Sequence, residues 1–328
     1  DDYYAIWDTY RTSSPLITLL TPQRQRDIVN SLINIYDNEG YMPDARSGNC
    51  NGRTQGGSNA EIVIADAFAK KLQGIDYEHA LMAMIKDAEV APADAEKEGR
   101  GGIAEYNSLG YIPYGIDRAG NRTVEYSYDD WCIAQVAKGL GYKVLYDKYL
   151  KRSGNWRNLW RGDYQWQGMR GFIMPRDADG NWLDSVVWGK SKVYHPLIPY
   201  TPDTKVAPWY IPWWGTFFYE ALSAEYSLSI PHDVPGLVEL CGGKEAFIKR
   251  LHTFFANKHY NVANEPSFMT PYLYHWVDRP DLSVARIRQI VNDNYNDTPL
   301  GLPGNDDSGA MSSWLVFNMM GLYPVAGQ

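Results

Sequence analysis

The chain of 328 residues is long enough to form one large core, and its formal net charge is −8. An acidic chain without a basic stretch lacks the cations that bind phosphate backbones, which excludes nucleic acid as a partner. Charged residues, Pro or Gly interrupt every apolar run before it is long enough to cross a bilayer, which excludes a membrane-spanning helix.

Amphipathic helix patterns begin close to the start of the chain. A helix is predicted over residues 22–38, because Thr21 is a candidate N-cap and Gly40 a candidate end. Its apolar face would consist of Ile28, Leu32, Ile33 and Tyr36. Further helices are predicted over residues 60–72, 76–88, 126–139 and 143–160, with a break at Gly141 between the last two.

Helical periodicity is lost from about residue 161 to residue 214, where aromatic residues, Gly and Pro are frequent. Turn signals at residues 175–177 and 179–180 predict an irregular or short-strand insertion. Insertions of this length usually serve a function. Helical patterns resume over residues 234–240, 243–256, 266–276, 283–295 and 308–320.

This tandem series of helices predicts an all-α fold, because the alternation of strands and helices typical of a parallel sheet is absent. No motif repeats at a fixed period, so a closed α/α toroid is favoured over a repeat solenoid. The chain begins with Asp1 rather than Met and ends without a polar tail, so we expect a domain that is truncated at both ends.

Three cysteines are too few for a disulfide framework and lack the spacing of a zinc site. Cys50 lies in a polar loop and is open to pairing, whereas Cys132 and Cys241 lie in apolar stretches that predict buried thiols. Asn-X-Thr sequons begin at Asn121 and Asn296, which is compatible with secretion.

The chain is rich in aromatic residues, with 12 Trp and 25 Tyr, and one cluster comprises Trp209, Tyr210, Trp213 and Trp214. Amphipathic rings stack on the apolar faces of sugars, but they also fill protein cores. Phosphate-binding, HExxH, GxSxG and CxxC motifs are missing, which excludes the commonest nucleotide-binding, metalloprotease and serine-hydrolase classes.

Several acidic residues lie among aromatic residues at the junctions between elements, where shifted pKa values are expected. They are Asp8, Glu125, Asp129, Asp130, Glu220, Asp306 and Asp307. Each is also a candidate helix cap, and Asp307 in particular directly precedes a predicted helix. The sequence leaves both interpretations open.

Glycosidic cleavage needs one carboxylic acid that protonates the leaving oxygen and a second carboxylate that activates water or attacks carbon. Glu220 follows Phe217, Phe218 and Tyr219, and apolar neighbours of this kind keep a carboxyl protonated. Asp307 has polar neighbours and would remain ionised, as a base requires. If the two cooperate by inversion, their carboxyl groups should lie roughly 6.5–9.5 Å apart.

Asn264 and Glu265 stand where a loop turns into a helix that starts with Pro266. Amide and carboxylate oxygens on a loop suit calcium, although the same residues are also typical of a helix cap.

These residues resemble glycoside hydrolase family 92, the calcium-dependent exo-acting α-mannosidases. The resemblance rests on motifs in the same order along nearly the whole chain: residues 7–11 (WDTYR), 64–67 (IADA), 125–131 (EYSYDDW), 231–236 (PHDVPG), 264–266 (NEP), 303–309 (PGNDDSG) and 311–314 (MSSW). It implies an (α/α)6 toroid preceded by an N-terminal β-sandwich, which is missing here. It also implies a secreted enzyme that releases terminal mannose from N-glycans or mannans by inversion.

The resemblance implies a role for individual residues as well. Glu220 corresponds to the general acid and Asp307 to the general base, and Asn305 stands where some members have an assisting Asp. The calcium ligands would be Glu265, the Asn264 side chain and a main-chain carbonyl near Val262. The expected contacts to the terminal mannose are Trp7, Asp8, Arg11, Glu125, Asp129 and Asp130.

Two positions depart from the family pattern. Many members have Gly-X-His-X-Asp where this chain has Asn59 and Glu61, so both are candidate sugar contacts of altered geometry. Members specific for α-1,2 links tend to carry a His-Glu pair where Lys258 and His259 stand, which makes His259 a candidate determinant of linkage. A mannose-binding protein on an inactive hydrolase scaffold and a purely structural toroid are the alternatives. The retained Glu220, Asp307 and Glu265 argue against the first alternative, and the second predicts no pocket where Glu220 and Asp307 converge.

Overall fold

The computed structural model describes residues 3–47, 55–187, 197–204 and 217–328. It forms two compact units. The first consists of Asp1–Tyr111, Glu125–Asn155 and Asp306–Gln328, and the second of Ile112–Val124 and Trp156–Asn305. Cys50 and the aromatic cluster at Trp209 to Trp214 lie outside the described residues.

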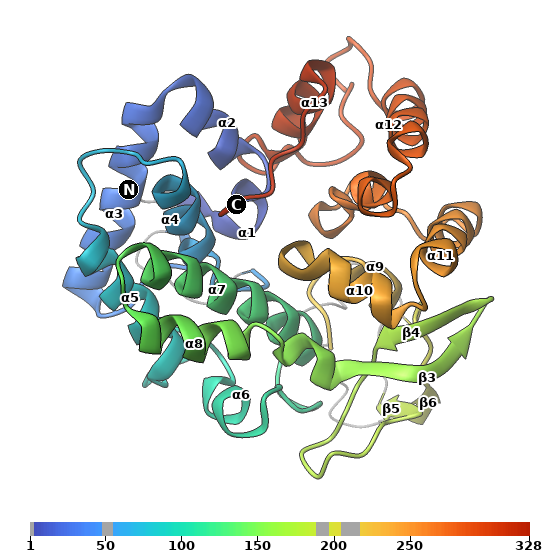
Figure 1. Cartoon of the computed structure of the whole chain (residues 1–328), viewed down its shortest axis with the longest axis horizontal. Helices are drawn as coiled ribbons and strands as arrows, with labels where there is room; N and C mark the ends of the chain where they lie inside the picture. The colour runs from blue at the N-terminus through green and yellow to red at the C-terminus, as the bar shows by residue number, and fades with distance from the viewer. Residues whose placement is uncertain (1–2, 48–54, 188–196, 205–216) are drawn as a thin grey trace. The chain divides into compact units, whose positions relative to one another are not determined.

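The first unit is helical, with one short pair of strands (Figure 1). Its helices are α1 (Ile6–Thr9), α2 (Ser13–Leu20), α3 (Pro22–Glu39), α4 (Ala60–Ala69), α5 (Tyr77–Glu89), α6 (Ile103–Leu109), most of α7 (Ala119–Gly139), α8 (Lys143–Arg152) and α13 (Ala310–Met320). Strand β1 (Tyr3–Ala5) pairs antiparallel with β2 (Ala45–Ser47), with Tyr4 opposite Arg46.

Helix α3 shows how local signals set the ends of an element. Pro22 occupies the first turn, where its missing N–H costs nothing, and Gly40 ends the helix in the left-handed conformation at φ 91°. The predicted cap was wrong in one respect, because the Thr21 side chain makes no capping hydrogen bond. Val29 is fully buried on the core face, whereas Ile28 is only partly buried.

The core of the first unit forms around α4, in which every residue from Ala60 to Ala67 is buried. A helix that is apolar on nearly all sides must be enclosed by others, and α4 packs against α2, α3 and α5. Asp76 caps α5 by accepting a hydrogen bond from the His79 N–H at 3.0 Å.

Helix α7 starts earlier than predicted, at Ala119, and Gly141 at φ 89° separates it from α8 as expected. Helix α8 ends at Arg152 rather than near residue 160, because a 3-10 turn (η1, Asn155–Leu159) and a strand follow. The early start places Asn121 and Glu125 on one continuous helix.

The second unit begins with strands and continues with short helices. Strands β3 (Trp160–Trp166) and β4 (Met169–Ile173) form an antiparallel hairpin, and β5 (Ser185–Val187) pairs with β6 (Leu197–Pro199). The helical elements are α9 (Ser223–Tyr226), η2 (Pro231–Asp233), α10 (Val234–Leu240), α11 (Lys244–Ala256), η3 (Glu265–Ser267), η4 (Thr270–Val277) and α12 (Pro280–Asn294).

The α-helix predicted over residues 266–276 is instead two 3-10 segments, η3 and η4. Apolar periodicity over so few residues does not distinguish the two helix types, and Pro271 inside this range interrupts an α-helical ladder. Within the described ranges, no helix combines the length and apolar character that crossing a membrane requires.

The two sequons lie in contrasting surroundings. Asn121 is fully buried in α7, and its Oδ1 accepts a hydrogen bond from the Tyr219 N–H at 2.9 Å. Asn296 is exposed in the turn after α12. Glycan transfer needs an accessible amide, so only Asn296 is an acceptor candidate in the folded chain.

Candidate active site

Glu125 on α7 contacts side chains from two other segments of the first unit, residues 7–11 and the start of α4. Its Oε1 accepts a hydrogen bond from Trp7 Nε1 at 2.7 Å, and its Oε2 accepts one from Asn59 Nδ2 at 2.9 Å. The Arg11 guanidinium lies 3.5 Å from Oε1. Three residues predicted as sugar contacts therefore each contact the buried carboxylate of a fourth, Glu125.

The backbone near this cluster is shaped to let the side chains approach. Arg11 Nε donates to the Trp7 carbonyl at 3.0 Å, and its guanidinium lies 4.9 Å from the centroid of the Trp7 ring. A Cβ on Gly57 would come within 2.4 Å of Asn59 Oδ1 and 2.6 Å of Glu125 Oε2. Only glycine fits there, so Gly57 keeps the amide and the carboxylate together.

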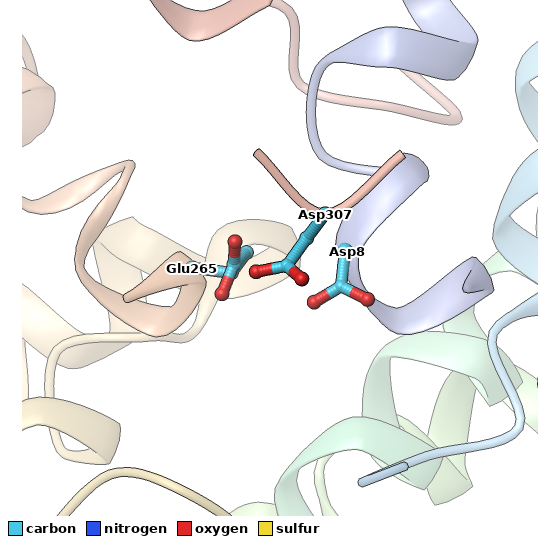
Figure 2. Close-up of side chains that lie close together, drawn as sticks. All are labelled: Asp8, Glu265 and Asp307. Carbon is cyan, nitrogen blue, oxygen red and sulfur yellow. The ribbon is translucent and has the colours of Figure 1, made fainter. Parts of the chain in front are cut away.

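Asp8 and Asp307 form a second acidic feature of the first unit. Figure 2 shows their side chains. Carboxylate oxygens of the two residues lie within 4.8 Å of each other. It also draws Glu265, which belongs to the second unit. Asp8 is buried and accepts a hydrogen bond from Gln55 Nε2, whereas Asp307 is half-buried.

Asp307 lies in a strained turn before α13. The φ angles of Asp307, Ser308 and Gly309 are 44°, 56° and 88°, a run in the left-handed region that non-glycine residues rarely occupy. Asp306 Oδ1 accepts hydrogen bonds from the Ser312 N–H at 2.9 Å and from its hydroxyl at 2.7 Å. These side-chain contacts to the helix start come from Asp306, one residue before Asp307.

A fully buried arginine, Arg100, pairs with several carboxylates of the first unit. Its Nη2 donates to Glu61 Oε1 at 2.8 Å and its Nη1 to Asp130 Oδ1 at 3.0 Å. Arg152 Nε also donates to Asp130, at 2.9 Å. The sequence analysis did not identify Arg100 as part of the site. The cluster of buried acids around α7 was the signal that a cation must lie among them.

Asp129 belongs to the same cluster but is not paired in the same way. Its nearest cation is Arg100 Nη2, 4.0 Å away, and no described residue forms a hydrogen bond to either of its carboxyl oxygens. Burial raises the pKa of Asp129 well above its usual value, and the charge of Glu61 adds to this effect. Glu61, Asp129 and Asp130 are all fully buried, so their roles as sugar contacts stay predictions.

In the second unit, Glu220 stands at the end of a buried aromatic stretch. Phe217, Phe218 and Tyr219 are buried and Glu220 is half-buried, with a φ of 59°. Asn264 Nδ2 donates to the Glu220 carbonyl at 3.1 Å. The candidate acid is thus connected to the candidate metal-binding motif within one unit.

The residues from 262 to 265 offer only oxygen ligands to a cation. Asn264 and Glu265 are buried, and Asn264 Oδ1 accepts the Glu265 N–H at 3.1 Å, which leaves it a second lone pair. A carboxylate, an amide oxygen and the Val262 carbonyl suit a hard cation such as calcium. The donor set therefore fits the predicted ion.

The remaining predicted residues, His259 and Asn305, belong to the second unit, where His259 is half-buried. His259 Nε2 and Gln167 Oε1 are 2.8 Å apart, and the imidazole packs against Trp166 with ring centroids 4.7 Å apart. Burial lowers the pKa of His259. Asn305 is exposed.

The glycosyl hydrolase family 92 catalytic domain matches this chain over residues 1–328. The chain belongs to glycoside hydrolase family 92. The resemblance noted in the sequence is therefore confirmed, and so is membership in a family of glycoside hydrolases.

Relatives of this family 92 chain include a protein of Arthroderma benhamiae described as an uncharacterized secreted glycosidase. It is 40% identical, and the match covers 90% of this chain and 39% of the relative. A family 92 α-mannosidase of Bacteroides thetaiotaomicron, solved in complex with mannoimidazole, has a TM-score of 0.82 and 30% identity, covering 99% of this chain and 42% of that one.

A family 92 inverting mannosidase of the same bacterium also has a TM-score of 0.82, with 31% identity over 99% of this chain and 43% of its own. The chain thus spans about two-fifths of the length of these relatives. The family and these structures confirm the predicted fold class, an all-α (α/α)6 toroid with short strands.

The carboxyl of Asp129 generates a prediction on stability. Because its pKa is raised in the folded state, folded protein keeps a proton that unfolded chain loses above about pH 4, and this part of the unfolding free energy falls as pH rises. Asp129→Asn removes the dependence. We expect the melting temperature of this variant, compared with that of wild type, to rise between pH 5 and pH 8 until the pH reaches the folded-state pKa of Asp129.

Asp130→Asn is the matched comparison on the same helix. It leaves Arg100 and Arg152 short of a buried charge and should cost about 3–5 kcal/mol at neutral pH. Thermal unfolding across the pH range measures both variants. Equal losses in both variants at every pH would show that Asp129 is ionised and paired.

Proposed function

We propose that this protein is an inverting exo-α-mannosidase, assisted by calcium, which releases terminal mannose from N-glycans or mannans. The observation that carries the proposal is the backbone geometry of the two candidate catalytic residues. Glu220 and Asp307 both occupy the left-handed region, at φ 59° and 44°. Such strain costs about 1–3 kcal/mol per residue, persists only where the surrounding structure holds it, and is common at active sites.

Glu220 is the proposed general acid. Its aromatic neighbours lower the local polarity and so favour the protonated carboxyl that the leaving oxygen needs. Asp307 is the proposed general base, which takes a proton from the attacking water, with Asn305 helping to orient it. Trp7, Asp8 and Arg11 are the proposed contacts to the terminal mannose.

Glu125 serves this site by fixing two of those contacts. Its carboxylate holds the Trp7 indole through a hydrogen bond and lies beside the Arg11 guanidinium, so neither side chain needs to be ordered by substrate. The buried pairs of Arg100 with Glu61 and Asp130 hold the helix that carries Glu125.

Glu265, Asn264 and the Val262 carbonyl would hold the calcium ion. When bound, calcium supplies a fixed positive charge for hydroxyl groups of the terminal sugar. We also propose that the protein is secreted, as the relative from A. benhamiae is described to be. His259 is the proposed determinant of linkage.

The first test of this proposal concerns the acid and the base. Glu220→Gln and Asp307→Asn should each lower kcat on a mannobiose by about 10²–10⁴-fold, because each removes one proton transfer. Proton NMR of the first-formed product should show β-mannose. A product of retained configuration, or full activity in either variant, would contradict the mechanism.

The second test concerns the ion. Glu265→Gln removes the charged ligand, so calcium binding measured by titration calorimetry should weaken strongly and activity should fall with it. Glu245→Gln, the same substitution at an exposed position of α11, is the matched control and should bind calcium normally. Full activity of wild type in excess chelator would show that residues 264–266 are only the start of η3.

The third test follows from the length of the relatives. We expect residues 1–328 alone to have a lower kcat/KM than the complete protein, because contacts to the leaving group made elsewhere contribute to transition-state binding. The two forms are compared on one linkage-defined mannobiose. Equal values would show that these residues contain the whole site.

A further inference from the structure

The start of α7 contacts the loop that carries Glu220. The Gly120 N–H donates to the Phe217 carbonyl at 2.7 Å, and Asn121 Oδ1 accepts the Tyr219 N–H at 2.9 Å. The Arg118 guanidinium lies 4.6 Å from the centroid of the Tyr219 ring. The start of the helix and the loop both belong to the second unit, and the three contacts involve two residues of the loop, Phe217 and Tyr219.

These contacts leave no space for a side chain at Gly120. A Cβ on Gly120 would lie 2.7 Å from Phe217 Cε1 and 2.8 Å from the Phe217 carbonyl oxygen. Asn121 is fully buried, so its amide oxygen has no access to bulk water in exchange for the Tyr219 N–H. An unpaired buried N–H costs about 1–3 kcal/mol, which makes this hydrogen bond a strong constraint on the loop.

Glu220 needs such a constraint because its own backbone is strained. The Ala221 N–H donates to the Tyr219 carbonyl at 2.8 Å, which closes a tight turn with Glu220 at its centre and φ at 59°. Asn121 holds the N–H of Tyr219, the residue before Glu220, and Asn264 holds the carbonyl of Glu220 itself. Without the first hydrogen bond, the residue could relax to a negative φ and turn its side chain away.

We propose that Asn121 is a positioning residue that fixes the carboxyl of Glu220 for proton donation to the leaving group. The inference rests on the proposed role of Glu220. It also assigns a use to the first sequon, whose asparagine is fully buried in the folded chain.

The test compares two substrates in the complete protein. An alkyl leaving group, as in a mannobiose, needs protonation, whereas the leaving group of 2,4-dinitrophenyl α-mannoside does not. Asn121→Leu has similar volume but no acceptor. It should lower kcat on mannobiose by about 10²-fold through misplacement of the acid, with little change on the dinitrophenyl substrate. Asn121→Asp keeps an acceptor oxygen and should restore most of the activity.

Two further variants separate positioning from general destabilisation. Gly120→Ala keeps the Asn121 amide but pushes on Phe217, and should show the same dependence on leaving group. Gln25→Leu removes another buried amide, which donates to Ser14 Oγ at 2.6 Å in the first unit. It should lower the melting temperature without any dependence on leaving group.

The variant Glu220→Gln distinguishes a failure of the proposed acid from a failure of the positioning role of Asn121. If it shows no dependence on leaving group, the assignment of Glu220 as the acid fails. If it does, but Asn121→Leu and Gly120→Ala lose activity equally on both substrates, Glu220 is the acid and the positioning role of Asn121 is overturned.

Discussion

The buried guanidinium of Arg100 is the interaction on which the first unit depends. It connects Glu61 on α4 with Asp130 on α7, two helices that are far apart in sequence. Burying these charges costs desolvation free energy, and the ion pairs offset that cost only when their geometry is good. The pairs therefore keep α4 and α7 in one relation, and Asn59 and Glu125 are carried by these helices into hydrogen-bond contact.

The candidate catalytic residues share a physical arrangement although they belong to different units. Each lies in a tight turn at positive φ, and each turn lies next to the start of a helix. At Asp307 the neighbouring Asp306 accepts the hydrogen bonds from α13, and at Glu220 the first turn of α7 accepts and donates to the loop. In both turns, side chains of neighbouring residues therefore hold the backbone around the candidate catalytic residue.

Much of the helical fold could be predicted from the sequence, because helix ends depend on local signals. Gly40 and Gly141 act over a few residues, and the ends that they mark agree with the structure. The 3-10 geometry of η3 and η4 could not be distinguished, since apolar spacing over a few residues is nearly the same for both helix types.

The candidate site was only partly predictable, for a different reason. Trp7, Asp8, Arg11 and Glu125 were found because they stand in recognisable motifs, and the structure shows contacts among three of them. Arg100 pairs with residues 30 and 39 positions away, which no local pattern reveals. Asn121 was considered only as part of a sequon. Its contact with the loop was missed because a three-residue motif carries no information on burial.

The burial of Asn121 sets up a kinetic competition in any eukaryotic secretory host. Oligosaccharide transfer acts on nascent chain, before tertiary structure removes an acceptor from reach. A glycan attached at Asn121 could not enter the space between α7 and the loop at Tyr219, so that molecule could not complete the second unit. The yield of native protein would depend on how fast this helix and loop come together relative to the transferase. A cytosolic or bacterial host imposes no such competition.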